Sequence, residues 1–153
     1  MIDASLTSTG SFTNNGTVNF SDDVDTIAGA VSGTGNFGLS NGSTLTFSAG
    51  ASSGETVTYG GGAADLLNLK LAQSFDATIE DFFTVGDAVD LTTFGHSAST
   101  FLYTQTGADS ASWTVKDGSK KAVINFAGEP YTQSDFQIVS ANGGAGSEIK
   151  FIG

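Results

Sequence analysis

The sequence predicts a nearly all-β protein, with a right-handed parallel β-solenoid or β-roll-like N-terminal half followed by a β-sheet C-terminal cap. Short segments of alternating polarity, separated by Gly, Asn and Ser, predict strands joined by tight corners. An internal repeat in the first third predicts stacked units. Only 14% of the residues are charged, which is too few for the charged faces of surface helices. The 153 residues suffice for a single domain, with the repeat-like part over 1–94 and the cap over 95–153.

The repeat organises the first third of the chain. Residues 9–20 recur as residues 34–47, with an offset of 25 residues at Phe12 that grows to 27 at Phe20. A weaker third copy covers residues 55–59. Repeats of this length are typical of stacked units that cannot bury their apolar faces alone, so a solenoid follows.

An antiparallel β-sandwich is the alternative fold. Asn15-Gly16 and Asn41-Gly42 are strong signals for two-residue hairpins, because both residue types tolerate positive φ. The solenoid is favoured because residues 31–59 resemble the β-helical repeats of large bacterial surface proteins and autotransporter passengers.

The second half of the sequence predicts a run of strands. Asp117-Gly118 predicts a hairpin between two of them, and Gly128 and Pro130 mark a further turn. Another turn is expected at residues 142–144. The predicted strands cover residues 100–103, 112–115, 122–126, 136–139 and 148–152.

Residues 78–94, TIEDFFTVGDAVDLTTF, are the most informative segment for identity. They resemble the segment that closes the repeat array in bacterial proteins of the RTX and related families, which are secreted through type I systems. Residues 115–149 resemble the C-terminal segments of the same proteins, with a Y-T-x-x-D-F element and a G-G-x-G-x-x-I ending. The resemblance implies a secreted or surface-displayed bacterial module that carries an uncleaved secretion signal near its C-terminal end.

Charge and composition limit the classes of partner that the chain is expected to bind. The net charge is −11, there is no Arg, and the first of the five lysines is Lys70, so nucleic acid is not expected to bind. There is no cysteine, which leaves burial, backbone ladders or metal to hold the fold. Residues 1–5 lack the features of a cleavable leader, and no apolar run is long enough to insert into a membrane.

Calcium is the only cofactor that the residues suggest. Residues 60–68 match the nonapeptide G-G-x-G-x-D-x-U-x at four positions and depart from it at Ala63. Asp65 would be the first ligand, with Asp87 and Asp90 next, since carboxylates suit a hard cation. One degenerate copy cannot build a shared calcium site, so a plain glycine-rich turn is the stronger interpretation.

No catalytic constellation is evident, and we expect no enzyme. His96 is the only histidine and has no identifiable triad partner. Three classes of function remain: a structural or adhesive module, a carbohydrate-binding module of a polysaccharide-acting protein, and a calcium-responsive folding module. The expected partners are polysaccharide or further copies of the chain. The aromatic side chains that could stack on sugar rings are Trp113, Tyr103, Tyr131 and Tyr59.

The apolar members of these segments form the predicted core. They are Phe12, Phe37, Leu45, Phe47, Val57, Leu67, Leu69, Ile79, Phe82, Val89, Leu91, Trp113, Ile124, Phe126 and Phe136.

Overall fold

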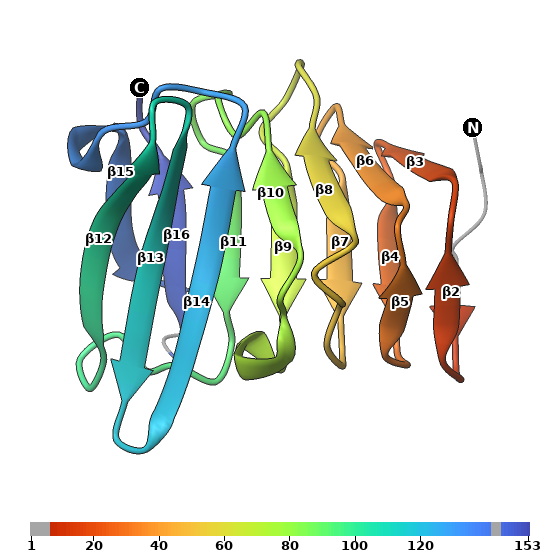
Figure 1. Cartoon of the computed structure of the whole chain (residues 1–153), viewed down its shortest axis with the longest axis horizontal. Coiled ribbons are helices and arrows are strands. Elements are labelled where there is room, and N and C mark those ends of the chain that lie inside the picture. Colours follow the sequence, from red (N-terminus) through yellow and green to blue (C-terminus); the bar gives the residue numbers. More distant parts are fainter. Residues whose placement is uncertain (1–6, 142–144) are drawn as a thin grey trace.

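A computed structural model describes residues 7–141 and 145–153 and confirms the predicted fold class. Parallel coils stack into a β-solenoid of about four turns, and antiparallel strands continue it at one end (Figure 1). The strands are β1 (Thr7–Ser8), β2 (Phe12–Asn14), β3 (Thr17–Ser21), β4 (Val24–Ile27), β5 (Val31–Gly33), β6 (Asn36–Ser40), β7 (Thr44–Phe47), β8 (Thr56–Tyr59), β9 (Leu66–Leu69), β10 (Thr78–Glu80), β11 (Ala88–Leu91), β12 (Thr100–Gly107), β13 (Ser110–Asp117), β14 (Lys120–Ala127), β15 (Phe136–Ser140) and β16 (Ser147–Phe151). Two 3₁₀ turns, η1 (Ala72–Ser74) and η2 (Gln133–Asp135), complete the elements.

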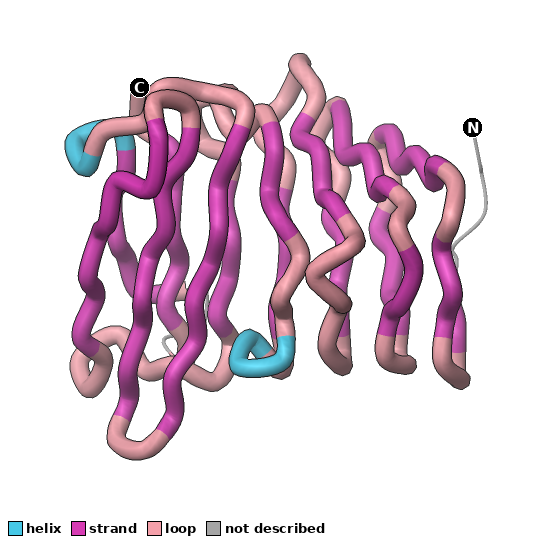
Figure 2. Tube along the Cα trace, in the orientation of Figure 1, coloured by secondary structure: helices cyan, strands magenta, loops and turns pink. Residues whose placement is uncertain are grey.

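Successive strands of the coils visit three faces in turn. The first sheet has the order β1-β4-β7-β9-β11-β16-β15, and the second has the order β12-β13-β14-β10-β8-β6-β3. A narrow third face pairs β2 with β5 and continues through the parallel bridges from Val31 to Ala51 and from Ala51 to Phe75. The two large sheets therefore form two layers that run the length of the molecule (Figure 2).

The coil length differs from the predicted repeat. Among β1 to β11, paired residues on the two large sheets are 19 to 22 positions apart, as in Thr17 with Asn36 and Leu66 with Ala88. The predicted offset of 25 to 27 is wrong as a coil length, because Phe12 stacks on Val31 and not on Phe37. A three-sided coil places similar strand motifs on different faces, so the two matching segments do not lie above one another.

The Asn-Gly pairs form corners of the coils and not hairpins. Asn41 and Gly42 have φ values of 59° and 87°, and they turn the chain from β6 on one sheet to β7 on the other. The strands on either side of this corner each pair with strands of the neighbouring coils in parallel. The alternative of an antiparallel sandwich throughout is therefore wrong for the N-terminal half.

The predicted core is confirmed with one exception. Every predicted core side chain is buried except Phe12, which is only partly buried in β2. Aromatic rings connect the coils, since the rings of Phe37 and Phe47 meet edge to face at 5.4 Å and Phe47 contacts Phe75 at 5.8 Å. The core also includes large side chains outside the prediction, namely Phe20, Ile27, Leu39, Tyr59, Phe75, Phe94, Val115, Tyr131 and Ile149.

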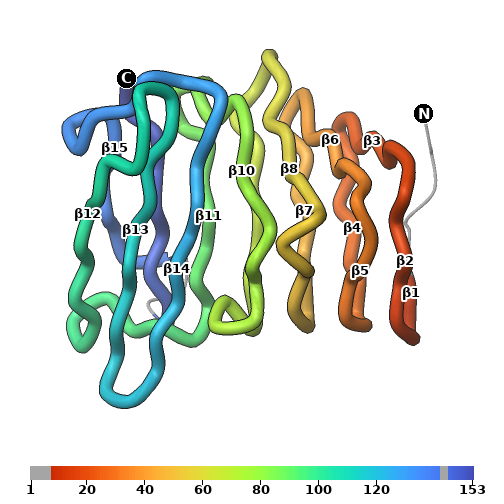
Figure 3. Tube along the Cα trace, viewed as in Figure 1, coloured from red at the N-terminus to blue at the C-terminus, as the bar shows by residue number. Residues whose placement is uncertain are grey.

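The strands β10 and β11 join the coils to the cap. On one side they pair in parallel with the coil strands β8 and β9. On the other side β10 pairs with β14, and β11 pairs in antiparallel orientation with β16 (Figure 3). Residues 78–94 therefore form the point at which the parallel array ends.

The predicted strands of the cap are all present. β12, β13 and β14 form a meander in which the predicted Asp117-Gly118 turn makes the second hairpin. β15 and β16 extend the first sheet, and β16 lies between β11 and β15. The predicted turn at residues 142–144, which includes Gly143 and Gly144 of the G-G-x-G ending, lies outside the described residues. Residues 1–5, examined for a leader, also lie outside them.

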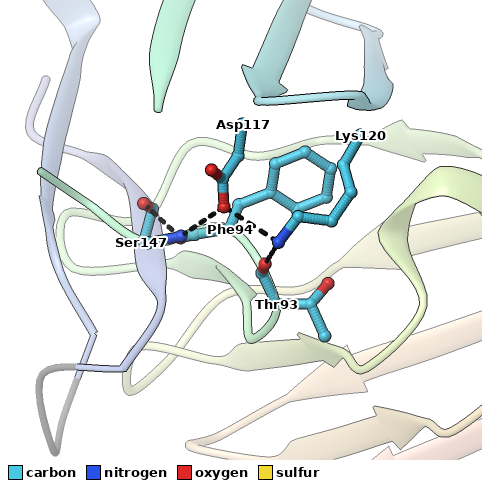
Figure 4. Close-up of polar contacts among 6 residues, drawn as sticks. Thr93, Phe94, Asp117, Lys120 and Ser147 are labelled. Carbon is cyan, nitrogen blue, oxygen red and sulfur yellow. Dashed lines mark hydrogen bonds and ion pairs between the residues drawn. The ribbon is translucent and has the colours of Figure 1, made fainter. Parts of the chain in front are cut away.

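A polar network holds the loop between β11 and β12 against residues of β13, β14 and β16 (Figure 4). The Ser147 hydroxyl donates to the carbonyl of Phe94 at 2.7 Å. The backbone N–H of Gly95 donates to Asp117 at 3.3 Å, and Lys120 pairs with the same carboxylate at 2.8 Å. Lys120 also donates to the carbonyl of Thr93. These contacts connect the loop to β14, to the preceding hairpin turn and to β16.

Candidate functional site

The solenoid places Asp65 and Asp87 at one corner, each directly before a strand of the first sheet. Asp65 precedes β9 and Asp87 precedes β11, and the parallel register stacks these strands one coil apart. The two side chains are 1% and 0% exposed. The fold therefore brings together two of the three residues predicted as calcium ligands.

Asp65 bridges its own coil to the preceding one. Its Oδ1 accepts hydrogen bonds from the backbone N–H groups of Gly42 at 2.9 Å and Ser43 at 2.8 Å. Its Oδ2 is buried without a hydrogen-bond partner. Burial raises the pKa of the Asp65 carboxyl above its ordinary value, and the two backbone hydrogen bonds oppose this shift.

Asp87 repeats the arrangement one coil further on. Its Oδ1 accepts from the backbone N–H of Asp65 at 2.9 Å, and its Oδ2 accepts from the N–H of Thr84 at 3.0 Å. Burial raises the pKa of Asp87 to about 6, and the neighbouring charge of Asp65 adds to the increase. The Tyr59 hydroxyl lies in the same field, and burial followed by these two carboxylates raises its pKa.

Asp90 lies apart from this corner. It belongs to β11 and faces Glu148 of β16 across the antiparallel ladder, on the outer face of the first sheet. Burial and then the charge of Glu148 raise the pKa of Asp90 to about 6.

Within residues 7–141 and 145–153, no group of three or more His, Cys, Asp or Glu side chains is placed to hold a metal ion. The corner carboxylates instead satisfy backbone donors between coils.

Sequence reasoning missed a second buried acidic corner. Glu55, which directly precedes β8, is 1% exposed. Its Oε2 accepts from the Asn14 amide at 3.1 Å, and that amide also donates to the carbonyl of Asn36 at 3.2 Å. Gly35 leaves space for this amide, because a Cβ there would lie 2.4 Å from the Asn14 side chain. The available signal was an acidic residue immediately before a strand, as at Asp65 and Asp87.

The four aromatic side chains proposed for sugar stacking do not form an exposed row. Tyr59, Trp113 and Tyr131 are 1%, 4% and 3% exposed. Tyr103 is partly buried; its ring meets that of Trp113 at 5.5 Å, and its hydroxyl donates to the carbonyl of Tyr131 at 2.8 Å.

The cap contains a pocket that the sequence did not indicate. It has a volume of about 230 Å³ and lies beside the end of β16, where the chain between β10 and β11 meets the segment around η2. Phe83 is 44% exposed at this pocket, while Tyr131 is almost fully buried. The complete lining is Phe83, Glu129, Pro130, Tyr131, Asp135, Phe151 and Gly153.

Hydrogen bonds hold the pocket walls in place. The Tyr131 hydroxyl accepts from the N–H of Phe82 at 3.0 Å and donates to the carbonyl of Ala127 at 3.4 Å. Asp135 Oδ2 accepts from the N–H of Thr132 at 2.6 Å, and the N–H of Ile152 donates to the Asp135 carbonyl at 2.8 Å. Burial raises the pKa of Tyr131, and the charge of Glu129 adds to this effect.

His96 has an exposed position in the loop after β11, with its ring centre 6.5 Å from that of Phe101.

Among the described residues no helix is both long and apolar enough to cross a bilayer. Comparisons of the chain with protein-family models, curated proteins and solved structures give no match.

Proposed function

We propose that this chain is a non-enzymatic structural and adhesive module of a secreted or surface-displayed bacterial protein. The proposal includes an uncleaved C-terminal secretion signal within residues 140–153. One observation carries it: the segment that resembles the array-closing element of type I-secreted proteins, residues 78–94, occupies the end of the parallel array here. The sequence resemblance and the position in the fold therefore agree.

The arrangement of the coils supports a structural role. A stack of parallel coils is a rigid rod, because each coil is paired along two large sheets with its neighbours. Such a rod can hold a binding surface away from its point of attachment. The cap replaces what would be the next coil with antiparallel strands and so ends the array.

The secretion signal requires a test that does not depend on the cap. β16 is an interior strand of the first sheet, so deleting residues 140–153 would also remove the pairing partner of β11 and β15. Residues 140–153 should instead be fused to the C-terminus of an unrelated passenger protein in a host with a type I transporter. We expect the passenger in the medium.

A scrambled segment of the same 14 residues serves as the matched control. Passenger export with residues 140–153 and retention with the scrambled segment would support the signal. Equal retention of both fusions would contradict it, and the structural role would then be judged separately by surface binding of the intact chain.

Calcium-responsive folding is the second candidate function, and the buried Asp65 Oδ2 without a donor favours it. A cation beside Asp65 and Asp87 would offset their buried charge. The test is a calcium titration of the intact protein monitored by circular dichroism, with magnesium in parallel. We expect calcium, and not magnesium, to raise the melting temperature. Asp65→Asn should abolish the increase, and an unchanged melting temperature would contradict the candidate.

A further inference from the structure

The pocket beside β16 combines apolar walls with negative charge. Phe83, Pro130 and Phe151 supply apolar surface, and the only ionisable side chains with a charge at neutral pH in the lining are Glu129 and Asp135. No lysine lines it. Four of the five lysines belong to the cap, yet none contributes to this pocket.

The side chains of the lining offer hydrogen-bond acceptors without free donors. Glu129 and Asp135 accept only, because ionised carboxylates carry no donor. The Tyr131 hydroxyl is the only side-chain donor in the lining, and it is already engaged with the carbonyl of Ala127. Asp135 uses Oδ2 for the N–H of Thr132 and keeps Oδ1 for another partner. A sugar, whose hydroxyls need acceptors and donors, is satisfied only in part by such a lining.

We propose that this pocket binds the side chain of a lysine presented by a partner polypeptide. An ammonium group has three donors and no acceptor, which complements the two carboxylates. Its alkyl stem packs on apolar surface while the charge remains near water, as the walls from Phe83 to Phe151 allow. A cation near an aromatic face is attracted further, and Phe83 is the exposed ring of this pocket.

The charge of the whole chain favours the same partner. A net charge of −11 attracts a basic polypeptide over long distances, and the pocket then supplies the local contact. The inference does not rest on the proposed secretion or structural role.

The test uses the intact protein and a capped lysine, N-acetyl-lysine methylamide, added during a titration followed by amide chemical shifts. The matched ligand carries an acetyl group on the ε-nitrogen, which removes the charge and keeps the stem. We expect shift changes at Tyr131, Phe151 and their neighbours with the charged ligand. The acetylated ligand should bind at least about fivefold more weakly, because the ion pairing and the cation–π attraction are lost.

Variants then separate the pocket from general attraction to an acidic protein. Glu129→Gln should weaken binding about threefold, and Phe83→Ala should weaken it by a similar factor. Asp76→Asn, an exposed carboxylate outside the pocket, is the charge-matched control and should leave the affinity unchanged. Equal binding of the two ligands, no shift changes at the pocket, or an equal effect of Asp76→Asn would overturn the proposal. Spectra of each variant away from the pocket establish that it is folded.

Discussion

The coil stack and the cap bury their apolar side chains against different kinds of support. In the coils, parallel ladders of short strands are supplemented by buried side chains at the corners, where Asp65 and Asp87 accept hydrogen bonds from backbone N–H groups of the preceding turn. In the cap, strands of eight residues form antiparallel ladders around clustered aromatic rings. Phe136 alone contacts Phe82, Tyr103, Trp113, Phe126, Tyr131 and Phe151.

This difference indicates which substitutions should destabilise each half most. A coil has little apolar volume of its own and depends on its neighbours, so a lost corner contact affects two turns at once. The cap has a three-dimensional aromatic cluster, and a single polar contact on its surface matters less. The strands β10 and β11 belong to both ladders and should make the two halves unfold together.

The largest effects are expected from removing one buried ring in each half. Phe47→Ala in the coils and Phe126→Ala in the cap should each lower the free energy of unfolding by about 3–5 kcal/mol, because both leave a cavity among fully buried side chains. Urea unfolding measured by fluorescence of Trp113 and by circular dichroism gives the change.

Phe12→Ala is the matched control, because Phe12 is only partly buried at the outer turn. Its effect should be about 1 kcal/mol. Coincident transitions in both probes would support coupling between the halves. A Phe126→Ala protein that loses its Trp113 signal while the coils stay folded would show that the halves unfold separately.

The next effect comes from the corner carboxylate of the coils. Asp65→Ala leaves the N–H groups of Gly42 and Ser43 without their acceptor and should destabilise the protein by about 1–3 kcal/mol. Asp65→Asn keeps an oxygen in place and removes the buried charge, so its effect should be much smaller. Urea unfolding of the two variants at neutral pH distinguishes them, and equal losses would contradict the role of Oδ1.

A smaller effect, which depends on pH, is expected at Asp90. Its pKa in the folded protein, about 6, exceeds the ordinary value of 3.8, so folding favours the protonated form. The stabilising contribution is complete below about pH 4 and is lost as the pH rises through about 6. Asp90→Asn should therefore raise the stability at pH 8 by about 1 kcal/mol, a value reduced for partial exposure, and leave it unchanged at pH 4.

Urea unfolding between pH 4 and pH 8 measures this dependence. The Asp90→Asn variant keeps the two nearby charged groups, Glu148, which faces Asp90 across the ladder, and Lys150, which lies 3.3 Å from the Glu148 carboxylate. Asp87 has a similarly raised pKa and leaves a residual slope. If the free energy of unfolding changed with pH equally in the wild-type protein and in Asp90→Asn, the prediction would be contradicted.

The all-β class and the core could be predicted because they follow from local alternation. Residues such as Leu45 and Phe47 or Ile124 and Phe126 alternate with polar neighbours, and this pattern alone selects the buried face. The coil length could not be predicted in this way. It depends on which face each strand joins, and similar motifs at Phe12 and Phe37 lie on different faces.

The candidate sites also include some that the sequence could indicate and some that it could not. Asp65 was found through the nonapeptide match at residues 60–68, with Asp87 and Asp90 as the further candidates, and the fold brings Asp65 and Asp87 together. The pocket in the cap could not be found, because Phe83, Glu129 and Phe151 are far apart in the sequence and meet through the pairing of β11 with β16 and of β10 with β14. The burial of Trp113 and Tyr131 could not be predicted either, because it depends on how the cap strands and the segment before η2 pack together.

The smallest effect is expected from the polar network beneath the cap. Lys120 pairs with Asp117, donates to the carbonyl of Thr93 and lies 5.4 Å above the centre of the Phe94 ring. Lys120→Met keeps the stem on the ring and removes the charge, so the urea midpoint should hardly change. The hydrogen bond from Lys120 and the N–H of Gly95 hold the pKa of Asp117 below its ordinary value, and the variant should raise this pKa. Amide exchange at Gly95 should also become faster, because its acceptor is held less firmly. Lys121→Met, at an exposed neighbouring position, is the matched control, and equal exchange rates in the two variants would show that the network does not restrain the loop.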